Sequence, residues 1–235
     1  MRLRRKERKK AARGSALRKL IVQTNPKSPI SEQYRSIRTS ISFSSADQSV
    51  RSLMITSAGP GEGKSTVAGN LAVAFAQQEK RVLLIDADMR KPTVHYTFNL
   101  ANYNGLTNVL TKQMELSQTV NETDIPFLLV LTSGPIPPNP AELLGSKAMD
   151  DCLEEACENF DIVIFDTPPL LAVTDAQILA NRCDGTVMVI NSEKTEINDA
   201  LKAKELLQSV QAKIIGTILN NKKMSKSNYY YDSDE

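Results

Sequence analysis

A glycine-rich segment that ends in Lys64 and Ser65 is the part of this sequence best suited to chemistry. It lies between an apolar run, residues 53–56, and a segment of helical character, residues 67–75. Glycines in such a loop let backbone N–H groups turn inward around phosphate oxygens, where a Cβ atom would intrude. A lysine at this position reaches the β- and γ-phosphates of a nucleotide, and the serine hydroxyl binds Mg²⁺. The segment therefore predicts a phosphate-binding loop at the start of a helix.

One residue departs from the usual pattern of such loops. Ala58 stands where the strict pattern has its first glycine. Alanine is tolerated there if its backbone is not left-handed. The alternative is a glycine-rich turn followed by a chance Lys-Ser pair, which the flanking strand and helix patterns disfavour.

Acidic residues follow two further apolar runs. Asp86 and Asp88 come after residues 82–85, and Asp166 comes after residues 162–165. Parallel strands bind ligands at their carboxyl ends, and alternation along a strand points Asp86 and Asp88 to the same side. Carboxylates beside a triphosphate suit Mg²⁺ ligation, directly or through water, and proton abstraction from a hydroxyl. The alternative is that these acids only cap the ends of strands or the starts of helices.

An amphipathic helix is predicted to begin after Ser28. Ser28 can cap it, with Pro29 at the first helical position. At 100° per residue the helix has an apolar stripe that can pack on the domain and a separate charged face that points outward. The stripe is Tyr34, Ile37 and Ile41, and the charged face is Glu32, Arg35 and Arg38. The alternative for the charged face is ordinary solvation.

The order of the elements predicts one α/β domain. The chain has 235 residues, of which 41% are hydrophobic, and apolar strands alternate with helical segments from residue 53 to residue 220. This alternation predicts a mostly parallel sheet with helices on both faces. The sequence shows no apolar run of about 18 residues and no signal peptide, and its three cysteines are read as free thiols in a reducing compartment.

Basic residues are concentrated at the amino terminus. Ten of the 29 Lys and Arg side chains, but one of the 27 acids, lie within residues 1–20, so the remainder has 19 basic and 26 acidic side chains, a net charge of −7. We expect residues 1–27 to form a flexible basic arm. Nucleic acid, an anionic lipid surface or an acidic partner would each attract it, and a solvated tail is the alternative. The polar tail, residues 221–235, contains Tyr229, Tyr230 and Tyr231, which have no core to fill there.

Taken together, these motifs resemble the bacterial tyrosine kinase (BY-kinase) family of capsule and exopolysaccharide synthesis, and more narrowly its separate Gram-positive kinase chain. The resemblance spans about residues 26–235 and implies a P-loop NTPase-like α/β fold over residues 28–220, with an oligomerisation helix near residues 29–44. It rests on the Glu32/Arg35/Arg38 pattern, the loop Ala58–Ser65, the strand ends 84–90 and 164–169, the segment 134–140 and the tyrosine cluster.

The resemblance implies an ATP-dependent protein-tyrosine kinase with Mg²⁺ as cofactor. Asp86 would take the tyrosine proton, Lys64 would bind phosphate oxygens, and Arg90 would support the site. Ser65, Asp88 and Asp166 would organise Mg²⁺. The nucleotide site would comprise Gly59, Gly61, Glu62, Gly63, Lys64, Ser65, Thr66 and, for the base, Asn220.

The resemblance also implies partners. Glu32, Arg35 and Arg38 would meet a neighbouring copy in a ring, and Tyr229–Tyr231 would be autophosphorylated in the next active site. A membrane-anchored activator would recruit the otherwise cytoplasmic chain to the inner face of the membrane, other proteins would be phosphorylated on tyrosine, and no nucleic-acid partner is expected. The rivals are a partitioning or positioning ATPase, which typically has lysine where this chain has Gly59, and an inactive docking module, against which the intact Lys64 and acids argue.

Overall fold

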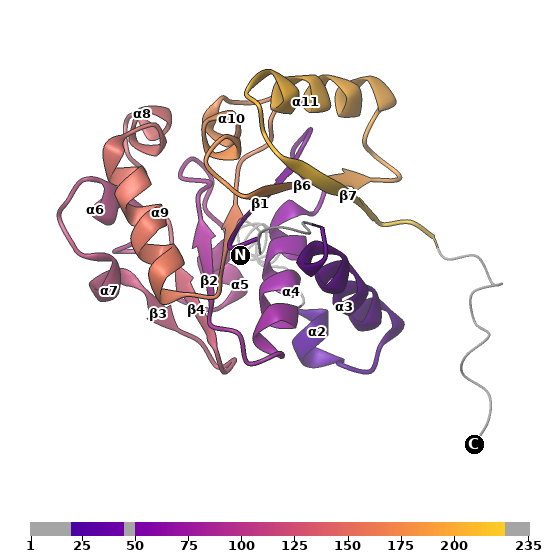
Figure 1. Ribbon diagram of the computed structural model, residues 1–235, viewed down its shortest axis with the longest axis horizontal. Helices are drawn as coiled ribbons and strands as arrows, with labels where there is room; N and C mark the ends of the chain where they lie inside the picture. Colours follow the sequence, from indigo (N-terminus) through magenta and orange to yellow (C-terminus); the bar gives the residue numbers. More distant parts are fainter. Residues whose placement is uncertain (1–19, 45–49, 224–235) are drawn as a thin grey trace, which may run out of the picture.

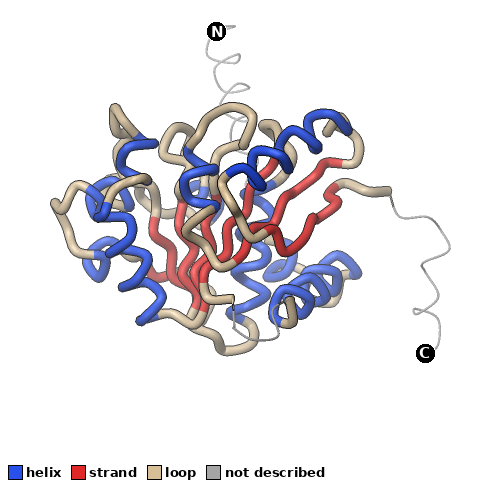
Figure 2. The backbone as a smooth tube through the Cα atoms, turned by 45° about the horizontal axis from the view of Figure 1, so that its top comes forward, coloured by secondary structure: helices blue, strands red, loops and turns tan. Residues whose placement is uncertain are grey.

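The computed structural model describes residues 20–44 and 50–223. A seven-stranded sheet runs through this part of the chain in the order β3-β4-β2-β5-β1-β6-β7 (Figure 2). Every neighbouring pair is parallel except β3 and β4. The strands are β1 Ser52–Ser57, β2 Val82–Asp86, β3 Asn121–Glu122, β4 Leu128–Leu131, β5 Ile162–Asp166, β6 Gly185–Asn191 and β7 Ile214–Asn220. The predicted α/β fold with a mostly parallel sheet is confirmed.

Helices cover both faces of the sheet (Figure 1). One face packs against α2 Ile21–Thr24, α3 Pro29–Ser42, α4 Lys64–Ala76 and α5 Val94–Thr97. The other face is covered by α6 Leu106–Leu110, α7 Leu116–Thr119, α8 Pro140–Leu144, α9 Lys147–Asn159, α10 Asp175–Ala180 and α11 Ile197–Ser209. Among the described residues, no helix is both long enough and apolar enough to cross a bilayer.

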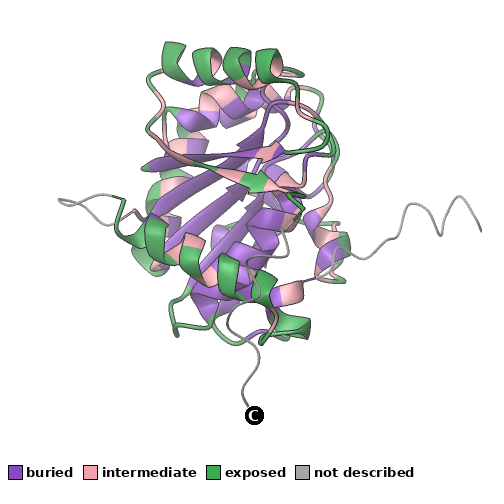
Figure 3. Ribbon diagram, turned by 90° about the vertical axis from the view of Figure 1, so that its right-hand side faces the viewer, coloured by how far each residue is buried: buried purple, intermediate pink, exposed green. Residues whose placement is uncertain are grey.

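Strand side chains alternate between the two apolar cores. In β1, Leu53 and Ile55 join the core beneath α4, whereas Met54 joins the core beneath α9 and α10. Helix α4 is buried over nearly its whole length, so both ends of this helix are held rigidly against the sheet. Figure 3 shows the resulting pattern, with buried strands inside and exposed residues on the outer faces of the helices.

The domain begins earlier than predicted. Leu20 and Val22 are buried, and the Val22 N–H donates to Asn70 Oδ1 in α4 over 3.1 Å. The predicted arm over residues 1–27 therefore extends too far, because the short apolar run from residue 20 to residue 22 packs on the domain. Residues 1–19 and the tyrosine cluster lie outside the described residues.

Helix α3 begins as expected but uses its charges differently. The Ser28 side chain accepts a hydrogen bond from the Ser31 N–H, and Tyr34 and Ile41 are buried. Arg38, predicted to point outward, instead donates from Nη1 to the Ala74 carbonyl over 2.8 Å and has a buried Nε. That carbonyl lies in the last turn of α4, where main-chain acceptors lack helical partners and attract a cation.

Candidate functional site

The glycine-rich segment forms the loop between β1 and α4. Gly61 and Gly63 have φ angles of 75° and 102°, a backbone conformation that residues other than glycine rarely adopt. Ala58 is buried and does not have a positive φ, so alanine is accommodated at this position. The loop therefore has the backbone conformation on which the predicted phosphate site depends.

Side chains from three segments brace this loop. Glu62 Oε1 accepts the Gly59 N–H over 2.8 Å, so the side chain of Glu62 is committed to the loop itself. Asn220, at the end of β7, donates from Nδ2 to the Glu62 carbonyl over 2.9 Å. Lys194 donates from Nζ to the Pro60 carbonyl. Asn220 thus lies beside the loop. Lys194 lies in a polar turn after β6 that matches no motif, so no signal in the sequence indicated its contact with the loop.

The predicted acids converge on the loop. Asp86 and Asp166 are register partners at the ends of β2 and β5, and both are fully buried. Asp88 Oδ2 lies 3.6 Å from Lys64 Nζ, so Asp88 forms an ion pair with the first residue of α4. Three segments that are far apart in the sequence therefore meet at the carboxyl edge of the sheet.

Asp86 is held more tightly than a solvent-facing acid. Its Oδ2 accepts the N–H groups of Thr93 and Val94, each over 2.9 Å, at the start of α5. Burial raises the pKa of Asp86 well above its ordinary value, and the nearby Asp166 raises it further, while the two backbone hydrogen bonds oppose the shift. The helix-capping alternative is therefore also correct for Asp86, and the carboxylate has the raised proton affinity that suits a proton acceptor.

The site has the donor set expected for a nucleotide with Mg²⁺. Ser65 Oγ is buried and has no hydrogen-bond partner among the described residues, which leaves it available to a metal ion. No cluster of three His, Cys, Asp or Glu side chains in residues 20–44 and 50–223 forms a ready-made metal site. Mg²⁺ commonly takes one or two carboxylates and fills its shell with phosphate oxygens and water, so these residues fit an ion that arrives with a nucleotide.

An arginine at the rim of the site has a partner that the sequence reading missed. Arg90 donates from Nε to Asp175 Oδ2 over 2.9 Å and from Nη2 to Asp175 Oδ1 over 3.0 Å. Asp175 is the first residue of α10 and is fully buried, whereas 40% of the Arg90 side chain is exposed. The available signal for Asp175 was an acidic residue that follows a threonine, Thr174, at the start of a helix. This pattern is indistinguishable from ordinary helix capping.

The charged face of α3 lies elsewhere. Arg35 Nη1 and Glu32 Oε2 form a surface ion pair of 2.6 Å. Arg38 reaches the carboxyl-terminal turn of α4, whereas Lys64 begins this 13-residue helix, so roughly 15 Å or more of helix separates them. Arg38 is therefore remote from the phosphate loop.

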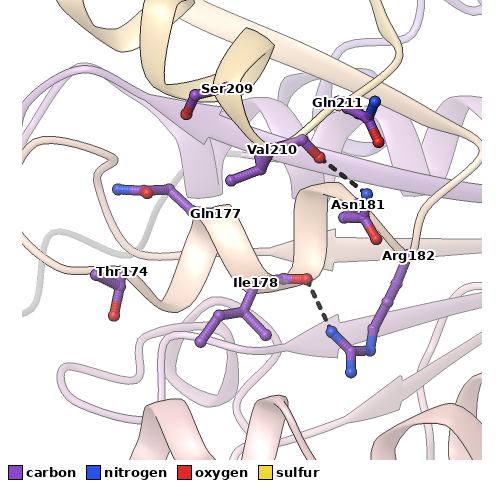
Figure 4. Close-up of a pocket in the computed structure, with 8 residues that line it drawn as sticks. All are labelled: Thr174, Gln177, Ile178, Asn181, Arg182, Ser209, Val210 and Gln211. Atoms are coloured by element: carbon purple, nitrogen blue, oxygen red, sulfur yellow. Dashed lines mark hydrogen bonds between the residues drawn. The ribbon is translucent and has the colours of Figure 1, made fainter.

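A separate surface hollow of about 450 Å³ lies between α10 and α11 (Figure 4). Its floor includes Ile178 and Val210, and Asn181 Nδ2 donates to the Val210 carbonyl across it. None of the residues predicted for the nucleotide site lines this hollow. The chemistry-bearing residues thus lie at the glycine loop rather than in the hollow.

Comparison with known proteins identifies the family. A family model described as an AAA domain matches residues 50–225. The tyrosine-protein kinase YwqD of Bacillus subtilis is 60% identical, over 93% of this chain and 92% of its own length. A putative tyrosine-protein kinase of Staphylococcus aureus, CapB, is 42% identical, over 94% and 97% of the two chains.

A solved structure agrees with the sequence relatives. The chimerical protein CapA2B2 superimposes with a TM-score of 0.84 at 47% identity, covering 87% of this chain and 90% of its own. Because sequence and fold agree over most of the length, the chain belongs to the bacterial tyrosine-protein kinase family, in the group that includes YwqD and CapB.

Proposed function

We propose that this chain transfers the γ-phosphoryl group of ATP to protein tyrosines. The observation that carries the proposal is the convergence of Lys64, Asp88 and the Asp86–Asp166 pair at one glycine loop. Phosphoryl transfer requires positioning and charge neutralisation more than covalent catalysis, and such an arrangement supplies both. The kinase relatives described above support the choice of tyrosine as acceptor.

The residues of the site divide the work of the transfer. The tyrosine oxygen attacks the γ-phosphorus, the bond from that phosphorus to the β–γ bridging oxygen breaks, and Asp86 accepts the phenolic proton. A tyrosine hydroxyl has a pKa of ~10. Because the pKa of Asp86 is raised, the difference in pKa between the tyrosine hydroxyl and its proton acceptor is smaller than for an ordinary aspartate. Lys64 and the loop N–H groups bind the phosphates. Mg²⁺, when bound, neutralises charge on the β- and γ-phosphates.

The remaining residues of the proposed site position these groups. Ser65, Asp88 and Asp166 would hold the metal ion, directly or through water. Asn220 braces the loop through Glu62 and would contact the base beside it. Gly59, Gly61, Gly63 and Thr66 would present backbone N–H groups to phosphate oxygens, and the side chain of Glu62 would keep the loop in shape.

Phosphotyrosine detection distinguishes this proposal from its rivals. Purified protein incubated with ATP and Mg²⁺ is expected to become phosphorylated on tyrosine, and Lys64→Met or Asp86→Asn is expected to remove the signal. A partitioning or positioning ATPase would hydrolyse ATP without phosphotyrosine. An inactive docking module would do neither.

We infer that the acceptors include Tyr229, Tyr230 and Tyr231 of a neighbouring copy in a ring-like assembly. Each phosphate adds about −1.5 to −2 charge, so a multiply phosphorylated tail fits poorly beside ATP and three acids. Phosphorylation would therefore release the tail and loosen the ring, with Glu32 and Arg35 at the contact between copies. Light scattering should give a lower mass for the phosphorylated protein than for the Tyr→Phe protein, and equal masses would refute the switch.

We also propose a membrane-anchored activator that brings the chain to the inner face of the membrane and so links it to capsule or exopolysaccharide synthesis. The support is the similarity of this chain to the chimerical protein CapA2B2. Its name joins CapA to CapB, and CapB is a relative of this chain. Mass spectrometry of the terminal peptide after ATP, with and without the cytoplasmic segment of a candidate activator, tests this. No increase in tail phosphorylation with any candidate would count against an activator.

A further inference from the structure

The segment that carries Arg90 is fixed at several points of its backbone. The Lys91 N–H donates to Asp88 Oδ1 over 3.0 Å. The N–H groups of Thr93 and Val94 both donate to Asp86 Oδ2. The two acids of the strand end therefore hold the main chain that directly follows Arg90, which restricts where its Cα can lie.

The side chain of Arg90 is fixed as well. Its Nε and Nη2 edge is occupied by Asp175, with contacts of 2.9 and 3.0 Å, which is the fork geometry that arginine and carboxylate favour. No hydrogen bond holds Nη1 among the described residues, and 40% of the side chain is exposed. A guanidinium with one edge bound and the other open at the rim is preorganised to receive an anion.

The position of this cation indicates which anion it receives. Lys64 is only 13% exposed and already faces Asp88, so it serves the interior of the phosphate loop. Arg90 lies at the rim, outside three acids that would repel an acidic peptide. The tail that supplies the proposed acceptors continues after Tyr231 with Asp232, Ser233, Asp234 and Glu235. A fixed cation at the rim would offset the repulsion between these carboxylates and the acids of the site.

We propose that Asp175 is a positioning residue, which holds Arg90 so that its open edge binds the acidic residues that follow the acceptor tyrosines of another copy. The inference rests on the proposed kinase function and adds a substrate preference to it. Acceptor tyrosines followed by carboxylates are then favoured over neutral ones. The ligand is an acidic peptide segment, recognised through charge-assisted hydrogen bonds.

Asp175→Asn is a better test than removal of Arg90. Without Arg90, the fully buried Asp175 would be an uncompensated charge, which is expected to destabilise the fold. Without the Asp175 charge, Arg90 is still partly solvated, so the fold is expected to survive. Asp150→Asn is the control for loss of an arginine–aspartate pair outside the proposed site, because Asp150 accepts from Arg182 Nε over 2.7 Å, although through one contact and with 44% of its side chain exposed.

The experiment uses the full chain with Tyr229, Tyr230 and Tyr231 changed to Phe, so that it cannot use its own tail. One synthetic peptide has the sequence of residues 224–235, and a neutral version carries Asp232→Asn, Asp234→Asn and Glu235→Gln. Peptide binding is measured by fluorescence anisotropy without ATP, and the KM and kcat for peptide phosphorylation are measured with ATP. Affinity for a fluorescent ATP analogue is measured in parallel.

Asp175→Asn is expected to raise the Kd and KM for the acidic peptide about tenfold, the loss of one charge-assisted hydrogen bond, with little change in ATP affinity. The neutral peptide should bind the parent enzyme about tenfold more weakly than the acidic peptide does. Asp175→Asn should change the affinity for the neutral peptide little. Asp150→Asn should match the parent. If Asp175→Asn does not fold, Arg90→Lys retains the ion pair but not the fork and should give the same loss.

Equal affinity of the parent for the two peptides would overturn the inference. So would a loss in Asp175→Asn that appears only in ATP affinity or in kcat, because Arg90 would then act on the nucleotide. If the parent phosphorylates neither peptide while its fold and ATP binding are intact, the proposed function fails instead.

Discussion

Gly63 and Asn220 approach so closely that the loop tolerates no side chain between them. A Cβ atom on Gly63 would lie 2.1 Å from Asn220 Nδ2, and the φ of Gly63 is 102°. The amide that would contact the base is thus locked against the loop that would bind the phosphates.

Gly63→Ala is therefore expected to weaken nucleotide binding severely. The added methyl group displaces Asn220 and strains a left-handed backbone, which typically costs about 1–3 kcal/mol, or roughly a factor of 5 to 150 in affinity. Titration with a fluorescent ATP analogue measures the loss. Gly216→Ala is the control, since an added Cβ at Gly216 meets nothing within 4 Å. Similar losses in the two variants would show that the Gly63 contact is not responsible.

Replacement of Asp86 should separate its chemical role from its structural one. Asp86→Asn keeps an oxygen for the N–H groups of Thr93 and Val94 but removes the group that accepts the proton, so we expect transfer to fall at least about 100-fold while the fold is retained. Asp86→Ala leaves both N–H groups without their acceptor and should also lower the free energy of unfolding by about 1–3 kcal/mol. Rate assays and urea unfolding measure the two effects. An active Asp86→Asn protein would exclude Asp86 as the proton acceptor.

Arg35 and Arg38 should behave differently despite their similar place in the sequence pattern. Arg38 bonds to the Ala74 carbonyl with its Nε buried, so Arg38→Ala should lower the unfolding free energy of the isolated subunit by about 1 kcal/mol or more. Arg35 pairs with Glu32 and donates from Nη2 to the Pro26 carbonyl over 2.6 Å. Both contacts are exposed, and surface ion pairs contribute about 0–1 kcal/mol, so Arg35→Ala should lower subunit stability less than Arg38→Ala does. Chemical unfolding compares the two variants at a dilution where only single subunits are present. Equal effects would contradict the intramolecular role of Arg38.

The three free thiols should react in a defined order. Burial raises the pKa of the Cys152 thiol to about 12 and raises that of the fully buried Cys183 further, whereas Cys157 is only half-buried. Thiolate is the reactive form, so Cys157 is expected to be alkylated first. Mass spectrometry after timed treatment with iodoacetamide measures the order. Early modification of Cys152 or Cys183 in the folded protein would show that the part of the core around them opens readily.

The sequence by itself determined the fold class and the main residues of the site. Apolar strands that end in Asp86 and Asp166, and a glycine loop before a helix, are local patterns whose geometry follows from backbone sterics and strand alternation. The loop ending at Lys64, the acids and the capped start of α3 at Ser28 could therefore be predicted without tertiary information.

Only the tertiary structure decided which side chain meets which. The pairing of Arg90 with Asp175, the brace from Lys194 and the bond from Arg38 to α4 join residues between 36 and 134 positions apart in the chain. Such contacts depend on how packed elements align in space, and a single sequence carries no local pattern for them. The inclusion of Leu20 and Val22 in the domain was likewise decided by packing, because so short an apolar run does not by itself predict which surface will bury it.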